Sequence, residues 1–552
     1  MGQKVDLLIT GTLINVQSGN LEDRTLAIDD GIIVGFGKQP SRRQIECEYI
    51  SPGLINSHTH VEVSMLTLSS YGSAVIPSGV TSVITDPHEI GNVLGIDGIR
   101  QMIDDAAETP LKAYFTVPSS VPASDLQDSG ADIGPQEVRT LLKNDLVVGL
   151  GEVMDTEALV EGAKDLHSMI RATREEGLVV DGHLPKVTGR KLHRAAQFLD
   201  NDHESVTFDE GREKIEAGLR LHLREGSSSK NLAELRPIID RFDHRQIMLC
   251  TDNFYIEDIR SHGGIDQIVQ TLIADGVDPV EVIQMATLHP AEEYDIPFGK
   301  PKPGAPADLV LLNDLETWDV AHVLIDGKID PAPTDDQLST THIEQNTVKF
   351  DPVAAEDLNI ASPEPGNIDV WVIDYSGRSA HRTTGTLEVI DGKLAANLEE
   401  DILPVSVIER HGKGGSIGNG FIHGLGLQNG ALASTVAHDA HNLVVAGTTY
   451  QAMADLANHL RQTQGGIAVY DQRSDSVTEL PLPIAGLMSD KSSHEVANQY
   501  QSVRKAAEKI GLDHPKGPMA LDTLTLEVIP ELRLSNKGLV DVERMEIIEV
   551  FN

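Results

Sequence analysis

Residues 52–66, PGLINSHTHVEVSML, decide the fold of this chain. The short apolar run GLIN (53–56) leads directly into His58, Thr59 and His60. Alternate side chains of an extended segment point to the same face, so both imidazoles can bind one metal ion. A His-x-His pair is a weak signal alone, because about one is expected by chance among 552 residues with 21 histidines. Its meaning depends on the residues at the ends of the other strands.

From residue 51 onward, short apolar runs alternate with helix-like segments such as 157–176 and 231–241. This pattern is typical of repeated βα units and a parallel sheet. Eight such units over residues 51–300 predict an α/β fold with a closed (β/α)8 TIM-type barrel. An open doubly wound sheet is the alternative, but no GxGxxG or Walker A motif follows any run. The predicted strands are 53–56, 80–86, 111–117, 146–153, 178–183, 198–203 (a poor match), 219–225 and 246–252.

The segments on either side of the barrel resemble each other. Residues 1–50 and 301–330 both read as short strands joined by turns, and we expect them to pair into one small β domain. Residues 331–347 are polar and predict a linker. Residues 348–552 mix strands, glycine-rich turns and helices, which indicates a separate C-terminal α+β domain.

Metal-binding residue types stand at the ends of the predicted strands, where barrel enzymes build their sites. His58, His60 and Asp252 suit one divalent ion, and His183 and His203 suit a second. Glu152 lies where a carboxylate can bridge both ions. Each residue alone could equally be a buried, hydrogen-bonded polar group. The set predicts a binuclear metal site with the ligands His58, His60, Glu152, His183, His203 and Asp252.

Such a pair of ions lowers the pKa of a shared water towards about 7, and Asp252 can orient that water and carry its proton. Imidazole and carboxylate ligands without thiolate suit manganese, iron or zinc, and the shared carboxylate favours Mn(II) or Fe(II). The H-x-E and P-C-x-x-C pattern of nucleoside deaminases is absent from the sequence. A thiolate-bound zinc of that kind is therefore excluded.

From end to end, the chain resembles the adenine deaminases of the amidohydrolase superfamily. The resemblance rests on these motifs: 52–66, TDPHEIGNVLGIDGI (85–99), PSSVPA (118–123), GLGEVM (149–154), DGHLP (181–185), DHE (202–204), REGSSSKNL (224–232), LCTD (249–252), STVAHDAHNLVVAG (434–447), LPLPIAGLMSD (480–490) and VIPELRLSNKGLVDV (528–542). It implies hydrolysis of adenine to hypoxanthine and ammonia in purine salvage.

The resemblance also implies roles for individual residues. Many barrel amidohydrolases have a carboxylated lysine on the fourth strand, whereas the adenine deaminases resemble this chain, with Glu152, in having glutamate there. By this analogy a metal-bridging hydroxide attacks C6 of adenine while an acid protonates N1. Glu62 is the first candidate for that acid, followed by Glu204 and Glu89. Each of the three could equally orient a metal-bound histidine.

The chain also departs from the family pattern. Residues 61–64 read Val-Glu-Val-Ser, where the family usually has I-E-S-S. Lys186, Asn253 and His289 stand where the family commonly shows glycine, aspartate and asparagine, and could shift substrate preference. Because all six predicted ligands are intact, adenine remains the expected substrate.

His438 and His441 have the i, i+3 spacing that places two side chains on one face of a helix. So far from the barrel in sequence, they indicate a structural role, at a domain interface or over the pocket. We assign no metal to them from the sequence.

The charge balance is strongly acidic, with 85 Asp plus Glu against 44 Lys plus Arg and a formal net charge of −41. Nucleic acid is therefore not an expected partner. The acids are scattered and 40% of residues are hydrophobic, which indicates a globular chain adapted to a salt-rich cytoplasm. An ordinary acidic mesophilic enzyme is the alternative. No targeting or membrane segment is evident, and Cys47 and Cys250 are too few for a disulfide framework.

Three rival functions remain open. The chain could act on another nucleobase or a cyclic amide, it could take a nucleoside instead of a free base, or it could be a non-catalytic barrel scaffold. Scaffolds of that kind lose ligands, and this chain keeps them. Barrels with an added β domain often associate, so a homo-oligomer is compatible with the sequence.

Overall fold

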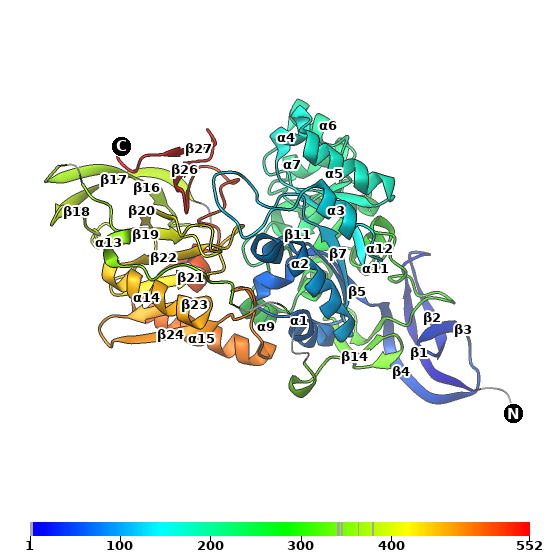
Figure 1. Cartoon of the computed structure of the whole chain (residues 1–552). Coiled ribbons are helices and arrows are strands. Elements are labelled where there is room, and N and C mark those ends of the chain that lie inside the picture. Colours follow the sequence, from blue (N-terminus) through cyan, green and yellow to red (C-terminus); the bar gives the residue numbers. More distant parts are fainter. Residues whose placement is uncertain (1–3, 339–342, 344–345, 363, 378–379) are drawn as a thin grey trace. The chain divides into compact units, whose positions relative to one another are not determined.

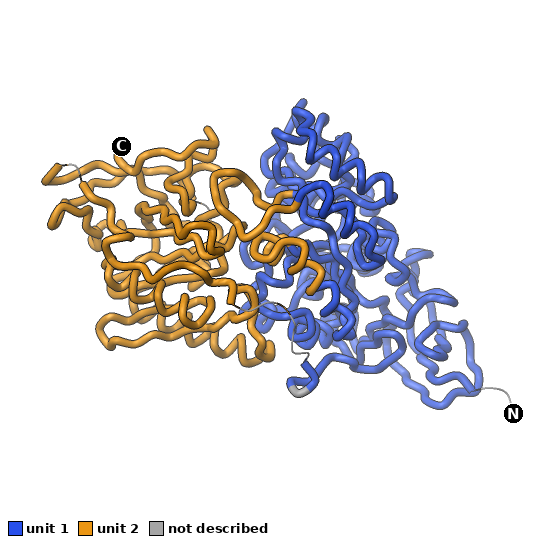
Figure 2. The backbone as a smooth tube through the Cα atoms, viewed as in Figure 1, with its two compact units in different colours: residues 1–87, 102–119, 134–340 blue, residues 88–101, 120–133, 341–552 orange. Residues whose placement is uncertain are grey.

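The computed structural model describes residues 4–338, 343, 346–362, 364–377 and 380–552. The chain divides into two compact units (Figure 2). Unit 1 comprises residues 1–87, 102–119 and 134–340, and unit 2 comprises residues 88–101, 120–133 and 341–552. Residues 339–342 and 344–345 of the predicted linker lie outside the described residues.

Unit 1 contains the barrel predicted from the sequence. Its strands run parallel in the order β5 to β9 and β10 to β12. The poorly predicted sixth strand is β10, which has only two residues. The eight strands are β5 (Leu54–Thr59), β6 (Val80–Thr85), β7 (Lys112–Val117), β8 (Val147–Val153), β9 (Val179–Gly182), β10 (Asn201–Asp202), β11 (Arg220–Arg224) and β12 (Ile247–Cys250).

The barrel closes between its first and last strands. Thr59 pairs with Asp252 in a parallel bridge, and the Asp252 N–H donates a hydrogen bond to the His58 carbonyl oxygen at 3.0 Å. The Asp200 N–H donates to the Val180 carbonyl oxygen at 3.0 Å, which joins β10 to β9. An open doubly wound sheet has no such closing contact, so the predicted closed barrel is confirmed.

Helices follow the barrel strands, as the alternating pattern predicted (Figure 1). The predicted helical segment 157–176 is two helices, α4 and α5, divided at Gly162, whose φ of 85° suits a residue without a Cβ. The helices are α1 (Leu68–Val75), α2 (His88–Asp105, shared between the units), α3 (Pro135–Leu141), α4 (Thr156–Glu161), α5 (Lys164–Glu175), α6 (Gly189–Ala195), α7 (Phe208–Glu216), α8 (Leu232–Leu235), α9 (Ile256–His262), α10 (Ile265–Ala274), α11 (Pro279–Met285) and α12 (Leu288–Glu293).

The segments before and after the barrel share one seven-stranded sheet of order β15-β14-β13-β4-β1-β2-β3. The join is the antiparallel pair of β13 with β4, and Ile9, Leu26 and Leu309 lie in the core beneath it. The strands are β1 (Val5–Asn15), β2 (Asn20–Asp29), β3 (Ile32–Phe36), β4 (Ser41–Pro52), β13 (Leu309–Asp314), β14 (Asp319–Ile325) and β15 (Lys328–Ile329). Unit 1 therefore carries a small β domain built from both sides of the barrel.

Unit 2 is a separate α+β unit centred on a nine-stranded sheet of order β18-β17-β16-β20-β19-β22-β21-β23-β24, with a smaller sheet of β25, β26 and β27. The strands are β16 (Asn367–Asp374), β17 (His381–Ile390), β18 (Lys393–Leu394), β19 (Ile402–Ile408), β20 (Ile417–His423), β21 (Ala431–Ser434), β22 (Leu443–Gly447), β23 (Gly466–Asp471), β24 (Ser476–Pro481), β25 (Leu532–Ser535), β26 (Gly538–Asp541) and β27 (Glu546–Ile548). The helices are α13 (Ala355–Leu358), α14 (Tyr450–Thr463) and α15 (Ser493–Lys509).

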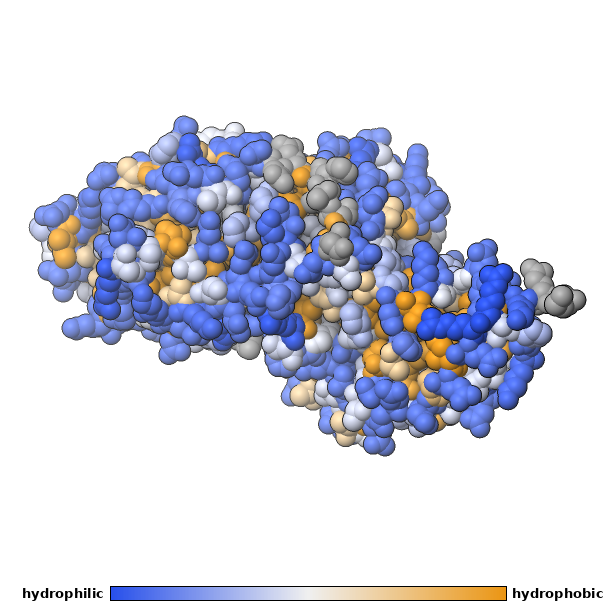
Figure 3. All heavy atoms as spheres, turned by 90° about the horizontal axis from the view of Figure 1, so that it is seen from below, coloured by the Kyte–Doolittle hydropathy of each residue, from blue (hydrophilic) through white to orange (hydrophobic). Residues whose placement is uncertain are grey.

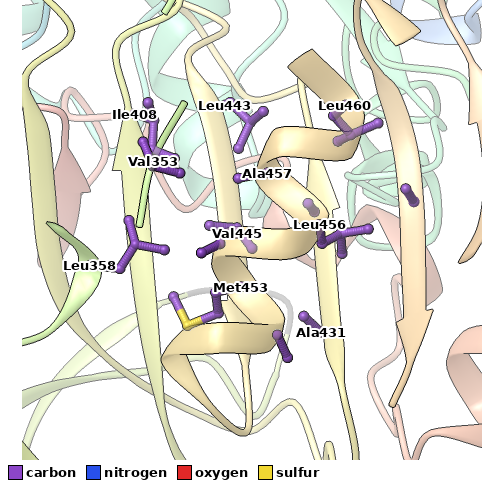
Figure 4. Close-up of a cluster of buried hydrophobic side chains, with 14 of the residues drawn as sticks. Val353, Leu358, Ile408, Ala431, Leu443, Val445, Met453, Leu456, Ala457 and Leu460 are labelled. Atoms are coloured by element: carbon purple, nitrogen blue, oxygen red, sulfur yellow. The ribbon is translucent and has the colours of Figure 1, made fainter. Parts of the chain in front are cut away.

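Helix α14 packs on this sheet through one apolar stripe (Figure 4). Met453, Leu456 and Leu460 are fully buried, at the three- and four-residue spacing of one helix face. They contact the buried side chains of Leu443 and Val445 on β22. This core fixes β21 and β22, the two strands whose connecting turn carries His438 and His441.

Hydrophilic side chains predominate on the face of the molecule shown in Figure 3. Both cysteines are free, Cys47 half-buried and Cys250 buried at the end of β12. Among the described residues, no helix combines the length and the apolar character needed to cross a membrane.

Candidate metal centre

The six residues predicted as metal ligands all lie at the carboxyl ends of barrel strands in unit 1. His58 is the penultimate residue of β5, and Glu152 is the penultimate residue of β8. The remaining ligands follow β5, β9, β10 and β12 by one or two residues. Five of the side chains are almost fully buried, and His183 is 12% exposed. The barrel therefore brings together residues that are up to 194 positions apart in sequence (58 to 252).

Glu152 is at the centre of this group. Its Oε1 atom lies 2.9 Å from Nε2 of both His58 and His60. Its Oε2 atom lies 2.9 Å from Nδ1 of His183, and the Nε2 atom of His203 is 3.7 Å from Oε1. Oε1 thus faces His58, His60 and His203, and Oε2 faces His183.

Asp252 completes the group around His58 and His60. Its Oδ1 atom lies 3.1 Å from Nε2 of His60 and 3.8 Å from Nε2 of His58. Possible ligand atoms of His58, Glu152, His203 and Asp252 all lie within 4.8 Å of one another, and those of His183, His203 and Glu204 form an overlapping group.

Four of these converging atoms make no hydrogen bond to a described residue. His58 Nε2, His183 Nδ1, His203 Nε2 and Glu152 Oε1 are buried and have no hydrogen-bond partner among the described residues. Buried polar atoms left in this state cost free energy unless another group satisfies them. Lone pairs that converge in this way are the arrangement of metal ligands, so the donor set fits divalent ions.

The two carboxylates are held ionised at neutral pH. Burial would raise the pKa of Glu152, but His203, His183 and the His-x-His pair hold it well below its usual value. Burial would also raise the pKa of Asp252, and the Arg224 guanidinium together with His60 lowers it instead. Ionised carboxylates are the form that binds metal.

Asp86, directly after β6, is hydrogen-bonded to two of the predicted ligands. Its Oδ2 atom accepts a hydrogen bond from the Glu152 N–H at 3.0 Å, and its carbonyl oxygen accepts one from His60 Nδ1 at 2.9 Å. A protonated Nδ1 leaves the Nε2 lone pair of His60 directed at the centre. Sequence reasoning did not identify Asp86, although its position at a strand end was the available signal.

Gly151 gives a direct test of this support. A Cβ atom at Gly151 would lie 2.0 Å from Asp86 Oδ2, so Gly151→Ala must displace the carboxylate that holds the Glu152 N–H. We expect a loss of about 10- to 100-fold in metal affinity or activity. Gly35→Ala is the matched control, because a Cβ at Gly35 meets no atom within 4 Å. Metal titration of both purified variants measures the effect, and equal affinities would contradict the role given to Asp86.

Arg224, the last residue of β11, is the second group that sequence reasoning missed. Its Nη1 atom donates a hydrogen bond to Asp252 Oδ2 at 2.7 Å and also contacts Glu204 Oε1. Burial would lower the pKa of Arg224, but the two carboxylates raise it. A permanent positive charge therefore holds Asp252 by one oxygen and leaves the other facing His60.

The three acid candidates lie in different surroundings. Glu62 is buried in the 3-10 helix η1 (Val61–Ser64), two residues after His60. Glu204 lies at the centre, with Oε1 3.5 Å from Nε2 of His203, and forms an ion pair with Arg224. Glu89 lies in unit 2, in contact with His438 and His441. Because Glu204 already pairs with a cation, Glu62 remains the first candidate.

The three departures from the family pattern also differ in position. Lys186 is exposed and has a φ of 59°, a left-handed conformation that favours the family's glycine. Asn253 directly follows Asp252, and its carbonyl oxygen accepts the Ser227 N–H at 2.8 Å. His289 Nδ1 donates to the carbonyl oxygen of Ile247, the first residue of β12. His289 is therefore at the end of β12 opposite Asp252, and we do not expect it to affect substrate preference.

The helical interpretation of His438 and His441 is wrong. Both lie in the turn between β21 and β22, where a single hydrogen bond joins the His441 N–H to the Ala437 carbonyl oxygen at 2.9 Å. The short strands on either side prevent that turn from continuing as a helix. The two imidazoles nevertheless meet a common partner, Glu89.

Comparisons with known proteins show the family of the chain. Residues 49–329 match the amidohydrolase family, and residues 379–546 match the adenine deaminase C-terminal domain. The chain is 38% identical to an adenine deaminase of Methanothermobacter thermautotrophicus over 98% of this chain and 99% of that protein. It is 35% identical to one of Listeria monocytogenes serotype 4b over 99% and 96%. A solved enamidase of the amidohydrolase superfamily is similar over 59% of this chain and 96% of its own, at 16% identity and a TM-score of 0.45. The chain belongs to the adenine deaminase family of the amidohydrolase superfamily.

Proposed function

We propose that this chain hydrolyses adenine to hypoxanthine and ammonia at the carboxyl ends of the barrel strands. The observation that carries the proposal is the position of Glu152, whose two oxygens each lie 2.9 Å from imidazole nitrogens of different groups. Full-length similarity to adenine deaminases supports adenine as the substrate. The proposed metal ligands are His58, His60, Glu152, His183, His203 and Asp252.

The proposed cofactors are two divalent ions, Mn(II) or Fe(II), with Zn(II) as the alternative. The donors are imidazole nitrogens and carboxylate oxygens without thiolate, which suits all three metals. When bound, such a pair of ions lowers the pKa of a shared water towards about 7 and so supplies a nucleophile near neutral pH.

Side chains of the protein would orient the attacking water and transfer the protons. Asp252, held by Arg224 through Oδ2, would orient the attacking water and accept its proton. Glu62 would protonate N1 of adenine, with Glu204 as the second candidate. The water oxygen becomes bonded to C6, and the amino group leaves as ammonia. The ring of hypoxanthine and one ammonia account for all atoms of adenine and water.

The decisive experiment is a substrate comparison. Purified protein loaded with Mn(II) or Fe(II) is mixed with adenine, and conversion is followed by ultraviolet absorbance and ammonia release. We expect turnover of adenine and much slower turnover of guanine, cytosine and adenosine. If guanine or cytosine is turned over and adenine is not, the proposed substrate is wrong. If none of the four compounds is turned over, the scaffold alternative is favoured.

We propose that the protein acts in purine salvage in a salt-rich cytoplasm. We expect no nucleic-acid or membrane partner, and a homo-oligomer is compatible with the sequence. Similarity to adenine deaminases supports purine salvage, and the net charge of −41 supports the salt-rich setting and the lack of nucleic-acid partners. The proposed domains are the small β domain (1–50 and 301–330), the barrel (51–300), the linker (331–347) and the C-terminal domain (348–552).

Salt dependence tests the halophilic part of this proposal. The Debye length is roughly 10 Å at 0.1 M and 3 Å at 1 M salt, so molar KCl screens repulsion among the surface carboxylates. We expect the Tm to fall when KCl is lowered from about 2 M to 0.1 M, measured with metal held constant. An equal Tm at both salt concentrations would support the ordinary acidic enzyme instead.

A further inference from the structure

We propose that unit 2 contains a further metal site, formed by His88, Glu89, His438 and Asp439. His88 and Glu89 are the first two residues of α2, and His438 and Asp439 lie in the turn between β21 and β22. All four belong to unit 2. Each is at most 4% exposed, and possible ligand atoms of all four lie within 4.8 Å of one another.

The distances between these atoms fit a single ion. Glu89 Oε1 lies 2.7 Å from His438 Nδ1 and 3.4 Å from His88 Nε2. Asp439 Oδ1 lies 3.8 Å from His88 Nε2 and 3.9 Å from His438 Nδ1. Ligands about 2.0–2.2 Å from a tetrahedral ion are separated by roughly 3.3–3.6 Å. Three of the four separations lie within about 0.3 Å of this range, the 2.7 Å separation is shorter, and all four atoms lie within 4.8 Å of one another.

The surroundings of Glu89 indicate a bound cation, because one of its carboxylate oxygens is left unsatisfied. Its Oε1 atom is buried and makes no hydrogen bond to a described residue, although His438 Nδ1 is only 2.7 Å away. At that distance two atoms either share a hydrogen or bind a common cation. A common cation would satisfy this buried oxygen.

The other oxygen of Glu89 is held by His441. The Ala437 N–H donates to His441 Nδ1 at 3.1 Å, so the proton of this imidazole is on Nε2, which donates to Glu89 Oε2. Oε2 is therefore occupied, and Oε1 faces His88 and His438. A second group that fixes a ligating carboxylate in this way is a regular feature of metal sites.

The turn that carries His438 is anchored before any ion binds. The His438 N–H donates to the Asp522 carbonyl oxygen at 2.7 Å, and the Thr525 hydroxyl donates to the His438 carbonyl oxygen at 2.6 Å. The fully buried Arg410 donates to the carbonyl oxygens of His441 and Ala485. The site is thus largely preorganised by the fold of unit 2.

The composition of the site indicates both the ion and its role. Two neutral imidazoles and two carboxylates neutralise one divalent cation, and nitrogen and oxygen donors without thiolate suit Zn(II), Fe(II) or Mn(II). Four protein ligands form a closed set, which is typical of a structural ion. The ion would fasten the start of α2 to the β21–β22 turn. Glu89 would then be a ligand, which removes it from the candidates for the acid at N1.

Metal counting tests this proposal independently of activity. The full-length protein is saturated with Zn(II), dialysed, and its metal content per chain is measured by mass spectrometry. We expect three equivalents for the wild type and two for His438→Gln. Glu152→Gln should retain one equivalent, because Glu152 is not one of the four ligands of this site, although a ligand atom of His88 lies within 4.8 Å of those of His60 and Glu152. His459→Gln is the control, since His459 belongs to unit 2 but pairs with Glu479 on a half-exposed surface.

Two outcomes would overturn the proposal. One is a wild-type count of two equivalents together with none in Glu152→Gln, because both ions then belong to the barrel site. This outcome does not need His438→Gln to fold. The other is an unchanged count of three in a folded His438→Gln protein. Either result would leave the residues as a hydrogen-bonded histidine–carboxylate cluster.

Discussion

Replacing Glu152 with glutamine is expected to lower kcat/KM for adenine on the order of 10³-fold. The amide keeps the shape of the side chain but has one acceptor oxygen and no negative charge, so it cannot join the two imidazole groups. Loss of a bridging ligand removes several kcal/mol of transition-state stabilisation, and each 1.4 kcal/mol corresponds to about tenfold in rate. Ammonia release and the number of metal equivalents per chain are measured on the same sample.

Glu161→Gln is the matched control for this variant. Glu161 ends α4 on the exposed surface, so its replacement makes the same chemical change away from the centre. We expect its activity and metal content to equal those of the wild type. If Glu152→Gln keeps full activity, Glu152 is not the bridge, and the assignment of the barrel site must be revised.

The barrel and its six strand-end residues could be predicted because both signals are local in sequence. An apolar run of four to eight residues is visible by itself, and so is the polar residue that ends it. The weakest prediction, near 198–203, corresponds to β10, whose two residues give almost no pattern. The predicted ligand His203 was still identified, because it ends the weak apolar run FLDNDH.

The supporting residues could not be predicted in the same way. Arg224 and Asp86 also stand at strand ends, but their roles depend on which atoms they face, and that is set by the closed barrel. His438 and His441 show the opposite difficulty. Their spacing is a local signal for a helix, yet their partner Glu89 is about 350 positions earlier, as 438 minus 89 gives 349. Contacts of that separation leave no trace in a single sequence.

Replacing Lys214 with methionine is expected to destabilise unit 1 by about 3–5 kcal/mol, the usual cost of leaving a buried charge without its partner. The Lys214 ammonium lies 2.6 Å from Asp202 Oδ2, and both side chains are fully buried. Asp202 also accepts the N–H groups of Leu184 and Glu204, at 2.8 and 3.0 Å. The pair therefore holds the backbone beside His183 and His203, so we expect weaker metal retention as well as a lower Tm.

A double variant separates charge from packing as the cause of this loss. In Asp202→Asn/Lys214→Met both charges are absent, and we expect most of the stability to return, although the new amide side chain can satisfy the two N–H groups less well. Lys191→Met is the control, because Lys191 pairs with Glu157 on the exposed surface, where such a pair contributes roughly 0–1 kcal/mol. A Tm for Lys214→Met equal to that of Lys191→Met would show that the buried pair does not stabilise the barrel. Metal content that recovers with the Tm in the double variant would show that the unpaired Asp202 charge, and not the lost ammonium itself, disturbs the backbone beside His183 and His203.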